Sequence, residues 1–361
     1  MNKNDIIKHL FLNTKIYFLF GAGTSYNIVD EKIAFPLMSD LLSCIKENTK
    51  IKNYYEQIRK EWKADGLIIK SIYDNYLFSK DANVETFLSV LDGVELYLLD
   101  KNLKKQLNQQ LIDIKTIIRD RINESDTSTV IDLYSDFYRG LINLKEHNSI
   151  KNQVIGIFTT NYDMMNELVM EDLNIHYYSG FDGLVNRMFK PAYYNYSYID
   201  RFKYNNRSII NDTNHVNLYK LHGSLSWFKN EDNEIVELNP SQKEFVPEII
   251  YPSVDKFNNT NLIVNFSSLL REFSNCICEE KTTLVVCGMS MGDEHINKII
   301  ENALSISSFH LIVYCFAESD ITKVINRFGT LDNVIIVGPK ATFKMLTNFI
   351  NDLGENSNEK S

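Results

Sequence analysis

The sequence is short of the features that mark secreted, membrane-embedded and nucleic-acid-coating proteins. Its 361 residues include only five cysteines, an odd number that indicates reduced thiols rather than a disulfide framework. The longest early apolar run, residues 16–20, is too short for a signal peptide or a membrane span. A formal net charge of −9 argues against a broad surface for DNA or RNA and leaves room only for a local basic patch. We therefore expect a cytoplasmic protein that binds neither membrane nor nucleic acid directly.

Metal ligands are also scarce. No pair of Cys-x-x-Cys elements occurs, and Cys276-Ile277-Cys278 has the wrong spacing for a structural zinc site, so we expect no metal. The chain does have the composition of a globular protein, with 44% hydrophobic and 24% charged residues. Its length allows one large or two ordinary domains with a sizeable core.

Apolar runs that alternate with helical patterns occur at both ends of the chain. Runs of β-favouring residues, which predict strands, occupy residues 16–20, 154–160, 216–221, 283–287, 311–316 and 334–337. Alternating strands and helices are typical of a doubly wound sheet. The predicted fold class is α/β, with a mostly parallel Rossmann-like sheet formed by residues 1–39 and 150–354. Residues 355–361 are predicted to be a disordered tail.

Residues 40–149 differ from the rest, because they show helical spacing only. Apolar residues recur three or four positions apart in residues 84–94, 103–118 and 130–144. The segment has no proline and few glycines, so we predict an all-helical insertion between the first two strands. Such apolar stripes ordinarily form core and helix–helix contacts, and we prefer that interpretation to a cofactor site.

Four predicted strands end in small or polar residues. These ends are Gly21-Ala22-Gly23-Thr24-Ser25, Thr159-Thr160-Asn161-Tyr162-Asp163, His222-Gly223-Ser224 and Gly288-Met289-Ser290. Each has an ordinary explanation: tight turns for the glycines, helix capping for Asn161 and Asp163, and a hydrogen-bonded turn for His222. Ligands bind at the carboxyl ends of strands in open α/β sheets. Four such ends together therefore predict one ligand site.

In this order the motifs resemble those of sirtuin-like domains. The resemblance is closest to the bacterial sirtuin-like proteins of antiphage defence, whose motifs read TTNYD and HGS. Asn83-Val84-Glu85-x-x-Leu88, at the head of an inserted helix, also looks like that branch. Deacetylating sirtuins carry a four-cysteine zinc module and a Pro-Asp-Phe-Arg stretch, whereas this chain lacks the former and has Asn27-Ile28-Val29-Asp30 instead of the latter. Both departures disfavour deacylation but leave NAD binding and glycosidic cleavage as expectations.

The resemblance implies an NAD+ glycohydrolase, an NADase that cleaves the bond between nicotinamide and ribose. NAD is then the substrate, and Asn161 and His222 are the catalytic residues. Asn161 would contact the nicotinamide ribose or the attacking water. His222 would act as a base, since histidine has an unperturbed pKa near ~6.5. The residues expected to bind NAD are Gly21, Ala22, Gly23, Ser25, Thr160, Asp163, Gly288, Ser290 and Asp293.

Within that set, the glycine turn after the first strand is expected to cradle the pyrophosphate, because such a turn before a helix N-terminus suits phosphate. Gly288 and Ser290 would line the opposite wall, with Asp293 near the adenosine end. Asp163 would orient the ribose or merely cap the next helix.

The resemblance also implies regulation, since uncontrolled NAD hydrolysis is toxic. We expect activation by homo-oligomer formation or by a partner, such as a HerA-like ATPase or another separately encoded sensor, in antiphage abortive infection. The inserted helices are the candidate assembly surface. Two alternatives stay open: a module that senses NAD or a nucleotide without cleaving it, and a sirtuin-type deacylase or ADP-ribosyltransferase. The presence of both Asn161 and His222 favours catalysis over binding alone.

Overall fold

The central sheet has seven parallel strands in the order β13-β12-β11-β1-β4-β8-β5. The computed structural model describes residues 2–26, 28–29, 32–33, 35–61, 63–147, 154–183, 185–196, 215–232, 234–238, 246–248 and 260–358. The strands are β1 (Lys15–Phe20), β4 (Ile155–Thr159), β5 (Tyr177–Tyr178), β8 (Val216–Lys220), β11 (Thr282–Cys287), β12 (His310–Tyr314) and β13 (Val334–Val337). The predicted mostly parallel α/β sheet is confirmed.

Alternate residues of each strand face opposite sides of the sheet, which creates two apolar cores. In β1, Phe18 and Phe20 belong to one core, and Tyr17 and Leu19 belong to the other. The first core is covered by α1 (Lys3–Asn13), α7 (Ser128–His147), α8 (Met165–Asp172) and α12 (Phe343–Asn358). The second core is covered by α9 (Thr260–Ile277), α10 (Glu294–Leu304) and α11 (Glu318–Phe328). Strands buried on both faces explain why their sequences are continuous apolar runs.

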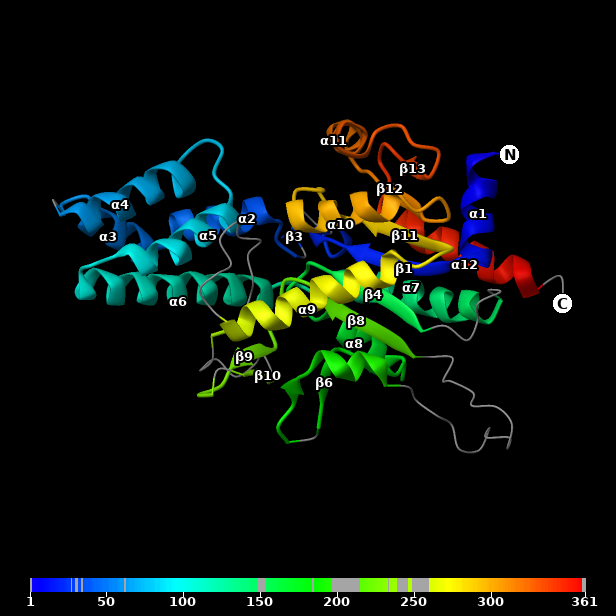
Figure 1. Cartoon of the computed structure of the whole chain (residues 1–361), viewed down its shortest axis with the longest axis horizontal. Coiled ribbons are helices and arrows are strands. Elements are labelled where there is room, and N and C mark those ends of the chain that lie inside the picture. The colour runs from blue at the N-terminus through cyan, green and yellow to red at the C-terminus, as the bar shows by residue number, and fades with distance from the viewer. Residues whose placement is uncertain are drawn as a thin grey trace.

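Between β1 and β4 the chain forms helices and a two-stranded hairpin. The hairpin is β2 (Ile28–Val29) with β3 (Lys32–Ile33). The helices before α7 are α2 (Met38–Glu47), α3 (Thr49–Ile58), α4 (Ala64–Ile72), the π-helix η2 (Tyr73–Leu77), α5 (Val84–Val94), the short η3 turn (Glu95–Tyr97) and α6 (Lys101–Asn123). Figure 1 shows α3, α4 and α6 extending to the left of the sheet, whereas both chain termini lie at its right.

The last inserted helix, α7, returns to the sheet. It packs along α12, and the ring of its Phe137 lies 5.3 Å from the rings of both Phe18 and Phe20 in β1. By sequence α7 belongs to the helical insertion, but by packing it is part of the core beneath β1. It therefore connects the projecting helices to the strands that end at the candidate site.

A second, smaller sheet lies beyond β8. It has the order β6-β7-β10-β9, with β6 (Phe181–Asp182), β7 (Met188–Phe189), β9 (Trp227–Lys229) and β10 (Ile235–Glu237). A 3-10 helix, η4 (Pro191–Asn195), follows β7. Strands of two or three residues are too short to produce a periodic sequence pattern, so the sequence did not predict this sheet.

The last helix is longer than predicted. The sequence places a disordered tail from residue 355, whereas α12 continues to residue 358. Gly354 lies inside the helix instead of ending it. Residues 359–361 lie outside the described ranges. No helix in those ranges is both long enough and apolar enough to span a membrane.

Candidate functional site

The carboxyl ends of four neighbouring strands form one edge of the large sheet. In the order β11-β1-β4-β8 these strands are parallel, so the loops after them emerge side by side. β1 leads into η1 (Ala22–Thr24), β4 into residues 160–163, β8 into residues 222–224 and β11 into residues 288–293. The structure thus brings the four predicted motifs to one edge, where open α/β sheets bind ligands.

Asn161 follows β4 and is almost fully buried, with 5% of its surface exposed. Its Nδ2 donates to Thr24 Oγ1 at 3.2 Å and to Ser25 Oγ at 3.3 Å, and its backbone N–H donates to Thr159 Oγ1 at 3.0 Å. Its buried Oδ1 has no hydrogen-bond partner among the described residues. An unsatisfied buried acceptor costs about 1–3 kcal/mol. The arrangement therefore presents a carbonyl oxygen that a ligand hydroxyl or a water would satisfy.

His222 is held by a carboxylate. Its Nε2 lies 2.9 Å from Asp293 Oδ2, and both side chains are 7% exposed. Asp293 also caps α10, because its Oδ1 accepts from the N–H groups of His295 and Ile296 at 2.8 and 3.1 Å. Burial acts to raise the pKa of Asp293, but the hydrogen bond from His222 and those from the two N–H groups lower it to about 2.

This pairing fixes the tautomer of the neutral imidazole. An ionised carboxylate can only accept, so Nε2 of His222 carries the proton, and Nδ1 of the neutral ring is an acceptor. Nδ1 is buried and has no partner within the part of the chain that the structure describes. The sequence predicted that Asp293 lies near the adenosine end of NAD, and it did not predict this contact of Asp293 with His222.

The two glycine loops pack backbone against backbone. A Cβ at Gly21 would lie 2.5 Å from the carbonyl oxygen of Gly288, and a Cβ at Gly23 would lie 2.8 Å from Gly288 Cα. The N–H of Gly21 donates to the carbonyl oxygen of Cys287 at 3.1 Å, and the N–H of Gly23 donates to the carbonyl oxygen of Gly288 at 2.9 Å. These two amides therefore hold the loops together, and a phosphate could use them only if those bonds were broken. The close approach of the two loops leaves no room for a side chain at Gly21 or Gly23.

The other predicted residues lie around these groups. Thr160 is half-buried, and its N–H and Oγ1 both donate to the carbonyl of Phe20, at 3.0 and 3.4 Å. Ala22 is half-buried, and Ser290 is exposed in the loop after β11. Asp163 lies one position before Met164, the N-cap of α8, and its Oδ1 accepts from the N–H of Met165, the first residue of that helix, at 3.0 Å.

Comparison with known protein families gives one match. Residues 155–333 match the family model described as SIR2-like domain. The chain carries a SIR2-like domain. The matched region contains Asn161, His222, Gly288 and Asp293, and the first glycine loop precedes it. SIR2-like domains bind NAD, so the family points to NAD-related activity. No curated protein matches the chain.

The SIR2-like domain contains a buried ion pair that the sequence analysis did not assign. Lys220 Nζ lies 2.9 Å from Glu167 Oε1 and also donates to the backbone carbonyl of Asp163, and both charged side chains are almost completely buried. The pair ties the end of β8 to α8 beside Asn161. A lysine inside an otherwise apolar strand was the available signal.

Tyr134 is a second residue that the sequence analysis missed. Its hydroxyl lies 2.9 Å from both Thr24 Oγ1 and Ser25 Oγ, the two oxygens that hold Asn161. In the sequence it is one member of the apolar stripe of α7, which is indistinguishable from ordinary core.

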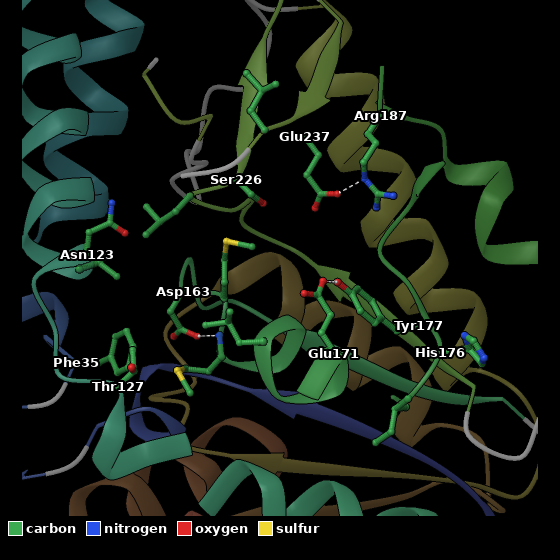
Figure 2. Close-up of a pocket in the computed structure, with 17 residues that line it drawn as sticks. Phe35, Asn123, Thr127, Asp163, Glu171, His176, Tyr177, Arg187, Ser226 and Glu237 are labelled. Carbon is green, nitrogen blue, oxygen red and sulfur yellow. Dashed lines mark hydrogen bonds and ion pairs between the residues drawn. The ribbon is translucent and has the colours of Figure 1, made fainter. Parts of the chain in front are cut away.

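A cavity of about 790 Å³ lies next to the loop after β4 and is lined in part by Asp163 and by Met165 and Leu168 of α8. Figure 2 shows Asp163 at its border, the hydrogen bond from Tyr177 to Glu171 and the ion pair of Arg187 with Glu237; both contacts are 2.8 Å long. Asn161 and His222 do not line this cavity. Its volume is in the range of small-molecule sites. Within the described ranges, no cluster of His, Cys, Asp or Glu could hold a metal ion.

Proposed function

We propose that the chain is an NAD+ glycohydrolase that converts NAD+ and water into nicotinamide, ADP-ribose and a proton. The observation that carries this proposal is a pair of buried acceptors without partners, Asn161 Oδ1 and His222 Nδ1, at the ligand edge of a SIR2-like domain. A domain that only bound NAD would not need a histidine whose proton is fixed on Nε2 by a carboxylate.

The reaction breaks the bond between C1′ of the ribose and the nicotinamide nitrogen, which leaves with the electron pair. Nicotinamide is cationic in NAD+, so the barrier lies in forming an oxocarbenium-like sugar. The partial negative charge on Asn161 Oδ1 would stabilise that sugar or orient the water that attacks C1′. His222 Nδ1 would take the proton from the water or from a ribose hydroxyl, and Asp293 would stabilise the resulting imidazolium, as a carboxylate does in a catalytic triad.

The test is to incubate purified protein with NAD+, alone and with candidate activators, and to quantify nicotinamide and ADP-ribose. We expect His222→Ala to lower kcat by about 10²–10⁴-fold, as for loss of a general base. We expect Asn161→Ala to lower it by about 10²–10³-fold, as for loss of an electrostatic stabiliser. His295→Ala is the matched control, because His295 is exposed and uses only its backbone N–H at Asp293.

The outcomes separate the competing functions. Tight NAD binding without turnover under every activating condition would support a nucleotide sensor instead. Transfer of labelled ADP-ribose to protein would support a transferase. Turnover that neither substitution affects would show that the site is wrongly assigned.

We further propose that NAD depletion serves antiphage defence and is triggered by self-association or by a separate sensor such as a HerA-like ATPase. Two features support this: the resemblance of the strand-end motifs to antiphage proteins, and apolar side chains exposed in the helical insertion. These side chains are Leu67, Ile68, Tyr76, Phe78, Tyr97 and Leu99.

A further inference from the structure

Four buried side chains form a closed hydrogen-bond network behind Asn161. Tyr134 Oη lies 2.9 Å from Thr24 Oγ1 and 2.9 Å from Ser25 Oγ. Asn161 Nδ2 contacts the same two oxygens from the other side, at 3.2 and 3.3 Å. Thr24 Oγ1 also lies 2.9 Å from the carbonyl oxygen of Gly21. All four side chains are at most 5% exposed, so bulk water does not compete for these bonds.

The protons of this network can be assigned, because each hydroxyl has only one. The Gly21 carbonyl can only accept, so Thr24 donates its proton there, and Thr24 Oγ1 then accepts from Tyr134 and Asn161. Since Tyr134 donates to Thr24, its oxygen accepts from the Ser25 hydroxyl. Ser25 Oγ in turn accepts from Asn161 Nδ2. Every donor in the network thereby has an acceptor.

We propose that Tyr134 is a positioning residue that fixes which way the Asn161 amide faces. With the tyrosine hydroxyl present, Thr24 donates to the Gly21 carbonyl and Ser25 donates to Tyr134. A flipped amide would lose both bonds from Nδ2, and its Oδ1 could gain one only if Ser25 gave up its bond to Tyr134. The tyrosine hydroxyl therefore favours the orientation in which the NH2 group faces this network and Oδ1 faces the site. This inference depends on the proposed function only for its effect on catalysis.

Without the tyrosine hydroxyl, the Ser25 proton loses its acceptor. Ser25 can then donate to Asn161 Oδ1 without giving up another bond, so the flipped amide becomes less unfavourable than in the wild type. The two orientations would interconvert, and Oδ1 would face the site for only part of the time. Because Tyr134 lies on α7, the helix that ends the insertion, its hydroxyl is also a direct contact between the inserted helices and the site.

Tyr134→Phe tests the proposal, since it removes the hydroxyl and keeps the ring. Tyr138→Phe is the matched control. Tyr138 lies one helical turn further along α7, is also fully buried, and donates to Asn166 Oδ1 at 2.9 Å, outside the network. We expect similar losses of Tm in both variants. Only Tyr134→Phe should lower kcat for NAD hydrolysis, by about tenfold, with little change in KM.

A double-mutant cycle tests whether Tyr134 affects kcat through Asn161, which a purely structural role of Tyr134 would not require. In an Asn161→Ala background, Tyr134→Phe should cause no further fall in kcat. An equal fall of kcat in Tyr138→Phe, or an undiminished effect of Tyr134→Phe without Asn161, would overturn the proposal.

The amide also provides a readout that does not require turnover. The side-chain NH2 resonances of Asn161, identified by their loss in Asn161→Ala, should be protected from hydrogen exchange in the wild type and in Tyr138→Phe. They should lose that protection in Tyr134→Phe. A wild type without NAD hydrolysis under any activating condition would refute the proposed function alone. Unchanged protection in Tyr134→Phe would refute the positioning role alone.

Discussion

The carboxyl group of Asp293 accepts hydrogen bonds from three donors, whose effect on its pKa opposes the effect of burial. Burial acts to raise its pKa, whereas His222 and the N–H groups at the start of α10 lower it to about 2. An aspartate in the unfolded chain has a pKa of about 3.9. Because the folded pKa is the lower of the two, protons bind preferentially to the unfolded chain. The stabilisation from Asp293 is therefore complete above about pH 4 and is lost as the pH falls towards 2.

Asp293→Asn tests this linkage. The amide can still cap α10, so the variant is expected to fold. We expect the free energy of unfolding of the wild type to fall by about 2 kcal/mol more than that of the variant between pH 5 and pH 2. Urea unfolding across this range measures the difference, and groups that titrate in both proteins cancel. Parallel pH profiles of the two proteins would show that the carboxylate is not stabilised in the fold.

At the residue scale, the sequence was sufficient for groups that directly follow a buried strand. The sequence placed Asn161 and His222 at the ligand edge because each follows an apolar strand, whereas their predicted catalytic roles came from the resemblance to sirtuin-like domains. The partners of these residues could not be found in the same way. Asp293 lies 71 positions from His222, and Tyr134 lies 109 and 110 positions from the two hydroxyls it contacts. Such pairings depend on how helices dock on the sheet, which a single sequence does not specify.

At the scale of elements, the contact between the loops after β1 and β11 is the tightest feature of the site. Gly288 has φ +69°, and a Cβ there would lie 2.4 Å from the backbone nitrogen of Thr24. Both the left-handed backbone and the close approach therefore exclude a side chain.

Gly288→Ala is expected to lower the free energy of unfolding by more than the strain of the positive φ alone would, because the added Cβ also meets the backbone of the other loop. Gly329 provides the control, because it has a similar φ of +74° but no atom within 4 Å of its added Cβ. Gly329→Ala should cost about 1–3 kcal/mol, the usual cost of a strained backbone conformation. Gly288→Ala should cost more and should also weaken NAD binding, since the loops must separate. Urea unfolding and calorimetric NAD titration measure the two effects, and equal costs in both variants would contradict the close contact.

The elements that the sequence predicted are those with long, regular patterns. In the large parallel sheet, the strands longer than two residues are apolar runs in the sequence. Helices α5, α6 and α7 follow the predicted apolar stripes. The two-residue strand β5, the small antiparallel sheet and η2 were not predicted. Short strands are stabilised by their tertiary neighbours and not by a local pattern, and a π-helix differs from an α-helix by only one inserted residue.

At the scale of the whole molecule, the helical insertion has one part inside the core and one part outside it. α7 packs beneath β1, whereas Figure 1 shows α3 and α4 far from the sheet. Exposed apolar side chains occur on this projecting part, where Tyr97 is 75% and Leu99 is 90% exposed. Isolated exposed apolar residues are common, but a group of them on one projecting segment is typical of an interaction surface. This is the surface to test for the proposed activation by self-association.

Replacing Tyr97 and Leu99 together by serine should weaken self-association with little effect on folding, because exposed substitutions usually change stability by less than about 0.5 kcal/mol. We expect a roughly tenfold or greater increase in the dissociation constant of the oligomer, measured by sedimentation. NADase activity per molecule should fall in parallel and recover at higher protein concentration. Val185→Ser is the control, since Val185 is 89% exposed and belongs to the hairpin between β6 and β7 and not to the helical insertion. A monomeric wild type with full constitutive activity would remove the basis for activation by assembly, and the search for a trigger would then move to α7 and its contact with Asn161 through Tyr134.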